Sequence, residues 1–368
     1  MKVIVVLIFL VSLLSCGMEK PSLKVAPYLR VLLTNANSMK IDAGNFVLMH
    51  QKGKEIAQGN IFVKISDGIL LLNDVPYGSF AKIEIAPEKY FEINGKKYRG
   101  NLEILYTNGT IYFINIVDIE SYLYSVVPSE VYPSWEKEAL KAQAVVSRTF
   151  ALYEFSYSRG KQKFFDVYSD TRSQVYKGME MEIEKINEIV NQTSGEVLKY
   201  RGMIIPAFFH SSSGGMTESS KAYFGYEKPY LVPVESKYSS TYPENKWSYS
   251  ISAEKFSKIF NVKNEITEVR VIKRTGSKRI DEVVIIDVQN QTNIISGKDL
   301  RSKLGESNVK SLRANIFLTN GEILFQGYGF GHGVGLPQWD AQGMAKEGKD
   351  YKTILKYFFP GVSIDKIW

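Results

Sequence analysis

The stretch that decides the fold is VVPSEVYPSWEKEALKAQAVVSRTFALYEFSY, residues 126–157. From Pro133 onward apolar residues recur every three or four positions, which predicts one long helix over residues 133–157. Pro133 suits a first helical position, where its missing N–H removes no hydrogen bond. Glu130 precedes this helix in an apolar turn bracketed by prolines, and such a surrounding raises a carboxyl pKa and suits general-acid work. The alternative is that Glu130 only favours the helix dipole, worth about 0.3–1 kcal/mol.

Outside this helix, strand patterns dominate the first third of the chain. Residues 27–96 hold short apolar or alternating runs punctuated by Gly, Asn and Asp. A hairpin is predicted around residues 107–109, Thr-Asn-Gly. We therefore expect an α+β fold with a β-rich N-terminal region over 27–96. A mixed sheet core over 97–368 follows, in which one long helix carries the site and residues 246–318 form a subdomain or an insertion.

The amino terminus has the form of a secretory leader. Residues 1–15 carry a lysine, then an apolar core of about a dozen residues, then a small residue. That core is shorter than the roughly 20 apolar residues of a membrane span. Cys16 follows Leu-Ser, which resembles a bacterial lipobox. We expect residues 1–15 to be a signal peptide, Cys16 to be lipidated and residues 16–26 to form a short tether. A signal peptide with an incidental cysteine is the alternative.

Composition narrows the class of protein. The 368 residues include 46 Lys+Arg and 39 Asp+Glu, a formal charge of +7, with 44% hydrophobic and 23% charged residues. These values are typical of globular chains rather than disordered ones. A single cysteine excludes an intrachain disulfide. No Lys/Arg run interleaved with aromatic residues indicates a nucleic-acid face. The mild positive charge suits an anionic wall or lipid surface, but it equally suits a lysine-rich proteome.

Two of the three histidines lie in the stretches richest in Gly and Ser. His210 opens HSSSGG at residues 210–215, and His332 lies within GFGHGVG at residues 329–335. A lone histidine is more often structural, but glycines let a backbone approach a ligand closely, so two such loops favour a site. The glycines are not a dinucleotide fingerprint, because no βαβ pattern surrounds them.

Four segments, in order and at similar spacing, resemble the sporulation stage II protein D family (SpoIID/LytB). They are the Val-Pro-Ser-Glu of residues 127–130 with the helix residues 137–151, then residues 173–178, 209–218 and 327–345. The resemblance covers residues 98–368. It implies a peptidoglycan lytic transglycosylase that acts on glycan strands whose stem peptides have been removed. It also implies, as the alternative, an amidase enhancer that stimulates a cell-wall amidase.

The resemblance assigns roles to individual residues. Glu130 matches the family's catalytic glutamate, and Lys141 and Arg148 match its helix Lys and Arg. Arg148 would orient Glu130 or bind the muramic lactyl carboxylate; the alternative is an ion pair with Glu130 or with an acid elsewhere. Further substrate contacts are expected from Gln174, Tyr176, His210, Ser211, Ser212, Tyr230, His332 and Gln338. Tyr223 and Phe224 would stack on sugar rings or belong to the core.

The expected reaction uses one carboxyl group twice. Glu130 protonates the leaving oxygen of the β-1,4 bond between N-acetylmuramic acid and N-acetylglucosamine. Its carboxylate then takes the proton of the sugar's own 6-hydroxyl, and a 1,6-anhydro ring closes. One carboxyl suffices because the attacking group belongs to the substrate.

Two departures from the family pattern affect these expectations. Some relatives hold zinc with Cys and His, but Ser173 and Ser213 stand where a thiol would be expected. We therefore expect no metal and no cofactor. The family's Pro-Tyr-Leu-Lys is Pro-Tyr-Leu-Val at residues 229–232, so the lysine and its substrate contact are missing.

The expected partners are peptidoglycan glycan strands, a cell-wall amidase and a bacterial membrane reached through the lipid anchor, with no nucleic acid. We expect secretion across the cytoplasmic membrane and anchoring as a lipoprotein that faces the cell wall or periplasm. Two competing classes stay open. A non-catalytic glycan-binding partner of an amidase needs a cleft but no acidic Glu130, and a structural wall protein needs neither.

Overall fold

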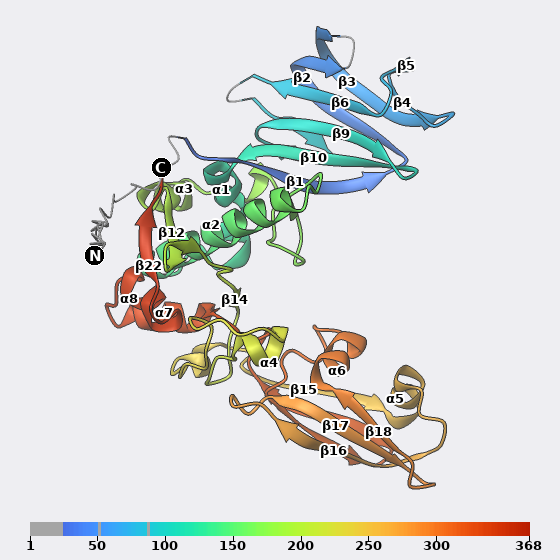
Figure 1. The fold of residues 1–368 in the computed structure, drawn as a ribbon, viewed down its shortest axis with the longest axis vertical. Coiled ribbons are helices and arrows are strands. Elements are labelled where there is room, and N and C mark those ends of the chain that lie inside the picture. The colour runs from blue at the N-terminus through green and yellow to red at the C-terminus, as the bar shows by residue number, and fades with distance from the viewer. Residues whose placement is uncertain (1–24, 51–52, 87–88) are drawn as a thin grey trace, which may run out of the picture.

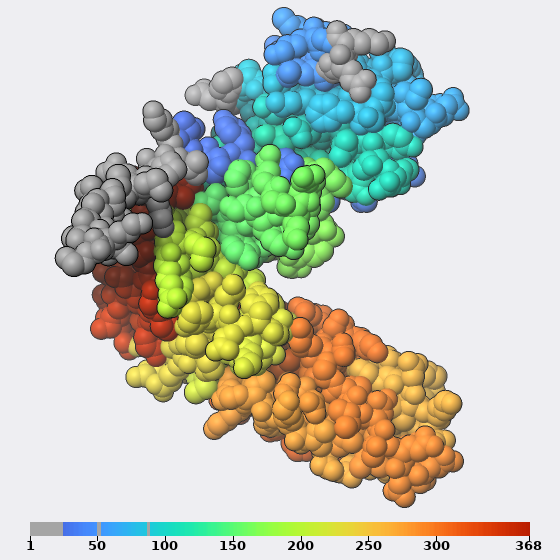
Figure 2. Space-filling model, viewed as in Figure 1, coloured from blue at the N-terminus to red at the C-terminus, as the bar shows by residue number. Residues whose placement is uncertain are grey.

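The computed structural model describes residues 25–50, 53–86 and 89–368; the expected signal peptide and Cys16 lie outside the described residues. The chain is elongated and bent, with one sheet at its N-terminal end, helices in the middle and a second β-rich part beyond them (Figure 1). Figure 2 shows a deep indentation between the helical middle and that second part. The predicted α+β fold is confirmed. In the described part of the chain no helix is long and apolar enough to cross a membrane.

One large sheet takes up the N-terminal third of the chain. Its strands are β1 (Tyr28–Ala36), β2 (Ser38–His50), β3 (Gly53–Ser66), β4 (Ile69–Leu72), β5 (Val75–Pro76), β6 (Phe80–Ile85), β7 (Phe91–Ile93), β8 (Lys96–Tyr98), β9 (Asn101–Thr107), β10 (Thr110–Asp118) and β11 (Val167–Tyr168). Their order is β11-β1-β10-β9-β6-β2-β3-β4-β5, with β7 between β2 and β8. The predicted hairpin is confirmed, since β9 pairs with β10 and both Asn108 and Gly109 have positive φ. This one sheet continues across the expected limit at residue 96.

A layer of helices packs on the sheet and shares its hydrophobic core. The layer contains α1 (Ile119–Glu130), α2 (Lys137–Gly160), a 3-10 turn η1 (Met179–Met181), α3 (Glu184–Gln192), α7 (Gln338–Lys346) and α8 (Tyr351–Phe358), with the small sheet of β12 (Glu196–Tyr200), β13 (Met203–Ile204) and β22 (Ser363–Lys366). The long helix begins at Lys137, not Pro133. Residues 131–136 form a turn in which the N–H of Trp135 donates to the Tyr132 carbonyl, and Trp135 is buried there.

The second β-rich part has a hydrophobic core of its own. It contains β15 (Lys246–Ser252), α5 (Ala253–Phe260), β16 (Ile266–Arg274), β17 (Ile280–Asp287), β18 (Thr292–Ser296), α6 (Gly297–Leu304), β19 (Ala314–Thr319) and β20 (Glu322–Tyr328). The strands form two three-stranded antiparallel sheets, β15-β20-β19 and β16-β17-β18. Its buried residues form a cluster separate from the main core. We call residues 246–328 the distal domain. This range extends past the expected limit at 318, because β20 pairs with β15.

Two crossing loops connect the distal domain to the helices. The first contains β14 (Phe209–His210), α4 (Ser220–Phe224) and the 3-10 turn η2 (Ser239–Thr241), and the second ends in β21 (Leu336–Pro337). β14 and β21 pair in parallel. This pairing places the two glycine-rich histidine loops side by side, although more than a hundred residues separate them in sequence.

Candidate active site

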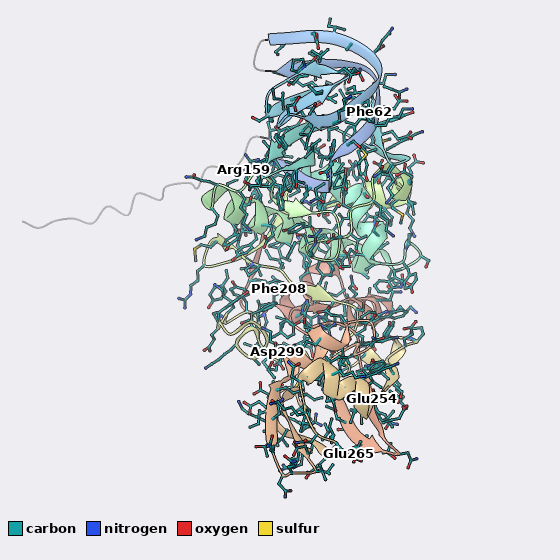
Figure 3. All side chains as sticks on the ribbon, turned by 90° about the vertical axis from the view of Figure 1, so that its right-hand side faces the viewer. Phe62, Arg159, Phe208, Glu254, Glu265 and Asp299 are labelled. Carbon is teal, nitrogen blue, oxygen red and sulfur yellow. The ribbon has the colours of Figure 1, made fainter. Side chains whose placement is uncertain are left out.

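A cavity of about 410 Å³ opens where the helices meet the distal domain. This volume lies within the range of roughly 300–1,000 Å³ that small-molecule sites occupy. The lining residues are Glu130, Phe150, Thr171, Arg172, Ser173, Phe208, Phe209, His210, Ser211, Tyr223, Phe224, Arg301, Glu306, Phe330, Gly331, His332 and Gln338. They come from α1, α2, α4, α6, the loops that follow β11 and α6, and the two crossing loops. Figure 3 shows Phe208 at this junction, with Asp299 of α6 on the side of the distal domain.

Glu130 is the carboxyl group of α1 in this cavity. It is the last residue of the helix, and its Oε1 accepts a hydrogen bond of 2.9 Å from the Val175 backbone N–H. Burial raises its pKa to about 7, although the Val175 N–H and the charge of Lys177 both act in the opposite direction. The C-terminal end of a helix carries partial negative charge and disfavours a carboxylate. The dipole explanation for Glu130 therefore fails, because the residue does not lie in the first turn of α2.

The two histidines of the crossing loops face each other in the same cavity. Their ring centroids lie 5.4 Å apart. His210 Nδ1 lies 3.2 Å from the Val334 carbonyl, so Nδ1 carries the proton, and Nε2 is buried without a partner among the described residues. His332 Nδ1 accepts from the Val334 N–H at 3.0 Å. One backbone residue thus fixes the tautomers of both rings.

Both imidazoles are neutral. Burial is the main cause in each: it holds the pKa of His210 well below its usual range and lowers the pKa of His332 to about 3. Aromatic rings surround His332, with centroids of Phe208, Tyr223 and Phe224 at 6.0, 5.5 and 6.0 Å from its own. The rings provide apolar walls, and His210 Nε2 is a buried acceptor beside them.

Gly331 allows the two histidine loops to approach this closely. Its φ is +113°, and a Cβ there would lie 2.6 Å from the Cβ of His210. A side chain at this position would therefore push His210 away from its place in the cavity.

Five residues expected in the site do line the cavity: Glu130, His210, Ser211, His332 and Gln338. Tyr223 and Phe224, expected to stack on sugars or to belong to the core, line it as well. Gln338 Nε2 donates to the Glu130 carbonyl at 3.3 Å and contacts Gln143 Oε1 at 3.4 Å. Gln338 therefore connects α7 to the end of α1 as well as facing the cavity.

Arg148 does not line the cavity, and its expected contact with substrate stays a prediction. Its side chain is fully buried and forms a bidentate ion pair with Glu120, with Nη2 to Oε2 at 2.7 Å and Nε to Oε1 at 3.0 Å. It also donates to the carbonyls of Val190 and Glu196. The alternative of an ion pair with an acid elsewhere describes this position, where Arg148 joins α1, α2, α3 and β12.

Lys141 and Tyr230 also lie away from the cavity lining. Lys141 pairs with Glu138 at 2.8 Å and lies over the Tyr351 ring, 5.4 Å from its centroid. Tyr230 is buried against Tyr200, with ring centroids 5.1 Å apart. These contacts belong to the helix layer and the core, and the substrate contacts expected of both residues stay predictions.

Gln174, Tyr176 and Ser212 stand behind the cavity rather than in its wall. The Gln174 Oε1 accepts from Tyr122 at 3.3 Å, and Tyr176 donates to Asn115 Oδ1 at 2.8 Å. The Ser212 hydroxyl donates to an Asn side chain at 3.3 Å. All three are buried, and the sugar contacts expected of them stay predictions. Gln174 and Tyr176 instead fix the backbone of Val175, which holds Glu130.

Two arginines of the lining were not expected from the sequence. Arg172 projects from the loop after β11, and Arg301 comes from α6 of the distal domain. Arg172 directly precedes residues 173–178, one of the segments that carried the resemblance. Arg301 had no local signal, because the distal domain matched no functional motif. Among the described residues no group of three or more His, Cys, Asp or Glu is placed to hold a metal ion.

Comparison with known proteins defines the family. A sequence model described as stage II sporulation protein (SpoIID) matches residues 107–200, which include Glu130, α2 and the Val175 segment. The stage II sporulation protein D of Bacillus subtilis is 33% identical over 264 residues, covering 68% of this chain and 75% of that protein. The chain belongs to the SpoIID family.

Other relatives of this SpoIID family member cover different shares of its length. An uncharacterized protein of Brachyspira hyodysenteriae is 36% identical over 275 residues, 74% of either chain. The amidase enhancer of Bacillus subtilis is 27% identical over 376 aligned positions, which cover 84% of this chain but 50% of that larger protein. The SpoIID resemblance expected from the four sequence segments is thereby confirmed.

Proposed function

We propose that this SpoIID family member is a peptidoglycan lytic transglycosylase with Glu130 as its single acid and base. The observation that carries the proposal is a carboxyl group with a pKa of about 7 in the wall of an open cavity. A group with this pKa is partly protonated at neutral pH, so it can donate a proton and take one back in the same turnover.

The proposed steps balance without water. The Glu130 carboxyl gives its proton to the O4 leaving oxygen of N-acetylglucosamine as the bond to C1 of N-acetylmuramic acid breaks. The Glu130 carboxylate then removes the proton of the 6-hydroxyl on that muramic residue, and O6 bonds to C1. Glu130 ends protonated again and the product is a 1,6-anhydro sugar. Because the nucleophile is intramolecular, no second carboxylate is required.

The rest of the cavity suits a sugar chain. Phe208, Tyr223 and Phe224 offer apolar faces on which a sugar ring can stack. His210 Nε2 has an unused lone pair, and Ser211 lines the same wall. Neutral imidazoles accept hydroxyl hydrogen bonds without adding a charge that would lower the Glu130 pKa.

A second candidate function is a glycan-binding amidase enhancer. It is favoured by the similarity to the amidase enhancer of Bacillus subtilis over 84% of this chain. Such a protein needs the cavity but has no use for a carboxyl with a raised pKa. A cell-wall amidase would then be its partner.

The location of the protein is part of the proposal. We propose that residues 1–15 direct secretion and that Cys16 carries a lipid, which would anchor the chain to a bacterial membrane facing the cell wall or periplasm. Peptidoglycan lies in that compartment, so the anchor and the proposed substrate agree. Mass measurement of the mature N-terminus tests this part.

The deciding experiment is mass spectrometry of peptide-stripped glycan strands after incubation with the mature protein and with Glu130→Gln. Anhydro-terminated fragments made only by the unmodified protein support the transglycosylase. Fragments with reducing ends would mean hydrolysis and would overturn the single-carboxyl mechanism. Intact strands that both proteins retain would favour the amidase enhancer.

A further inference from the structure

A second hollow, of about 290 Å³, lies on the distal domain. It forms where β16 and β20 end and β19 begins, beside the turn between β16 and β17. The polar residues that line it are Arg274, Lys278, Arg313, Asn315, Gln326 and Tyr328. None of these residues lines the candidate active site. We call this hollow the distal pocket.

The distal pocket is basic and its charge is uncompensated. Arg274, Lys278 and Arg313 are cationic, and among the described residues that line the pocket none is acidic. The ion pairs that the described residues of the distal domain form include none of these three cations. Burial lowers the pKa of both arginines, and no neighbouring carboxylate acts in the opposite direction.

Other cations of the same strand do have partners. On β16, Arg270 pairs with Glu268 at 2.7 Å and Lys273 pairs with Asp281 at 2.8 Å. The distal domain as a whole has 14 Lys and Arg but nine Asp and Glu. Three of the excess cations therefore meet in the distal pocket, and such a concentration of positive charge attracts an anion.

The two guanidinium groups of the pocket are held in place by uncharged acceptors. Arg274 Nη1 donates to the carbonyls of Lys278 and Ala314 at 2.9 and 3.0 Å. Arg313 Nη1 donates to the Ser277 carbonyl at 3.2 Å. Carbonyl groups orient a guanidinium but leave its net charge in place. The pocket is therefore arranged for an anion before any anion binds, which lowers the cost of binding.

The chemistry of the pocket fits phosphate better than carboxylate. Asn315 accepts from Arg274 Nη2 through Oδ1 at 2.9 Å, which leaves its Nδ2 as a further donor beside Lys278 and Arg313. One guanidinium fork satisfies a planar carboxylate, as in the exposed ion pair of Arg172. A phosphate monoester has up to two charges and three acceptor oxygens. It can therefore accept from cations of several segments at once.

We propose that the distal pocket binds a phosphate group, carried by a sugar phosphate or free in solution. The hollow leaves room for a sugar ring beside the phosphate, with Gln326 to bond hydroxyls and the Tyr328 ring as an apolar face. This site is separate from the candidate active site, so the proposal does not depend on Glu130 or on cleavage of glycan strands.

The test is calorimetry of the mature protein at low ionic strength. The probes are inorganic phosphate and glucose 6-phosphate, with acetate and glucose as controls for charge and for the sugar. We expect both phosphates to bind, acetate to bind about tenfold more weakly and glucose not to bind. Phosphate binding should weaken strongly at about 1 M salt, because exposed cations are then screened.

Lys278→Gln is the variant that leaves the fold intact, because Lys278 is exposed and its side chain makes no hydrogen bond or ion pair in the described part of the chain. It should weaken phosphate binding about tenfold, the loss of one charge-assisted contact. Adding Arg313→Gln should abolish binding. That change also removes a bond to the Ser277 carbonyl, so the single variant is the one that decides.

Two matched variants remove a cation elsewhere. Lys255→Gln alters an exposed lysine of α5, near the end of the domain where the Ala253 N–H donates to the Gly321 carbonyl. Arg172→Gln removes an exposed charge from the lining of the candidate active site. Both variants should bind phosphate as the unmodified protein does.

Tighter binding of glucose 6-phosphate than of inorganic phosphate would support a sugar phosphate as the ligand, and equal affinities would support free phosphate. The proposal is overturned if neither phosphate binds or if acetate binds equally well. It is also overturned if Arg172→Gln loses binding while Lys278→Gln keeps it. Because no turnover is measured, these outcomes are independent of whether the protein cleaves glycan strands.

Discussion

The Oε1 of Glu130 accepts the backbone N–H of Val175 at 2.9 Å, across 45 residues of sequence. This bond joins the end of α1 to a segment whose neighbours, Gln174 and Tyr176, are buried and hydrogen-bonded to the helix and sheet. The carboxyl group is therefore held in one orientation while burial keeps its pKa high. The Val175 segment sets the orientation of the Glu130 carboxyl group, and burial of that group sets its pKa.

The pKa of Glu130 predicts the pH dependence of strand cleavage. The acid must be protonated to start the reaction, so kcat/KM should be level at low pH and fall about tenfold per pH unit above about 7. Lys177 is exposed and its charge lowers this pKa. Lys177→Gln should therefore move the alkaline limb to higher pH. If kcat/KM began to fall near pH 4.5 in both proteins, the assignment of Glu130 as the acid would be contradicted.

The same pKa predicts a stability effect in Glu130→Gln. The folded-state pKa of about 7 exceeds the ordinary value of 4.5, so the unfolded chain binds fewer protons between these values. The stability of the unmodified protein should thus fall as pH rises from about 4.5 to 7. Gln removes the charge, and we expect the variant to be more stable by roughly 1–3 kcal/mol at pH 8 and little different at pH 4. Urea unfolding at both pH values measures this difference, and equal stability at pH 8 would contradict it.

The sequence alone predicts the class of fold and five of the residues that line the cavity. Strand patterns, one long helical period and two glycine-rich histidine loops were enough, because local propensity and tertiary structure agree there. The position of Glu130 was harder to predict. Pro128 favours a turn, yet α1 continues through it because Val126, Val127 and Pro128 are all buried, and their packing outweighs the lost hydrogen bond.

Long-range ion pairing was not predictable. Arg148 looked unusual among apolar helix residues, but nothing near it in sequence identifies Glu120, 28 residues away, as its partner. Arg301 belongs to a domain whose place beside the cavity depends on how the crossing loops pair. Residue spacing along a chain carries little information about either contact, because both depend on which elements pack together.

Breaking the pair of Arg148 and Glu120 should destabilise the fold. Arg148→Met leaves the largely buried Glu120 carboxylate without its guanidinium partner. We expect the free energy of unfolding to fall by about 3–5 kcal/mol. Arg148→Met combined with Glu120→Gln should lose less, since no charge is left unpaired. Arg172→Gln, which breaks an exposed pair, should cost about 0–1 kcal/mol. Chemical unfolding of the unmodified protein and the three variants measures these free energies of unfolding. A cost for Arg148→Met as small as for Arg172→Gln would contradict the structural role.

Gly331 should be required for activity through its contact with His210. In Gly331→Ala the new Cβ would meet the His210 Cβ at 2.6 Å, so His210 must move, and displacements of this size cost up to about 100-fold in rate. Gly321→Ala is the matched control, because that glycine also has a positive φ, +75°, but open space around its Cβ position. Both variants carry the backbone strain and should lose some thermal stability, whereas only Gly331→Ala should lose cleavage and glycan binding. Equal activity of the two variants, measured well below their melting temperatures, would mean that the position of His210 does not matter.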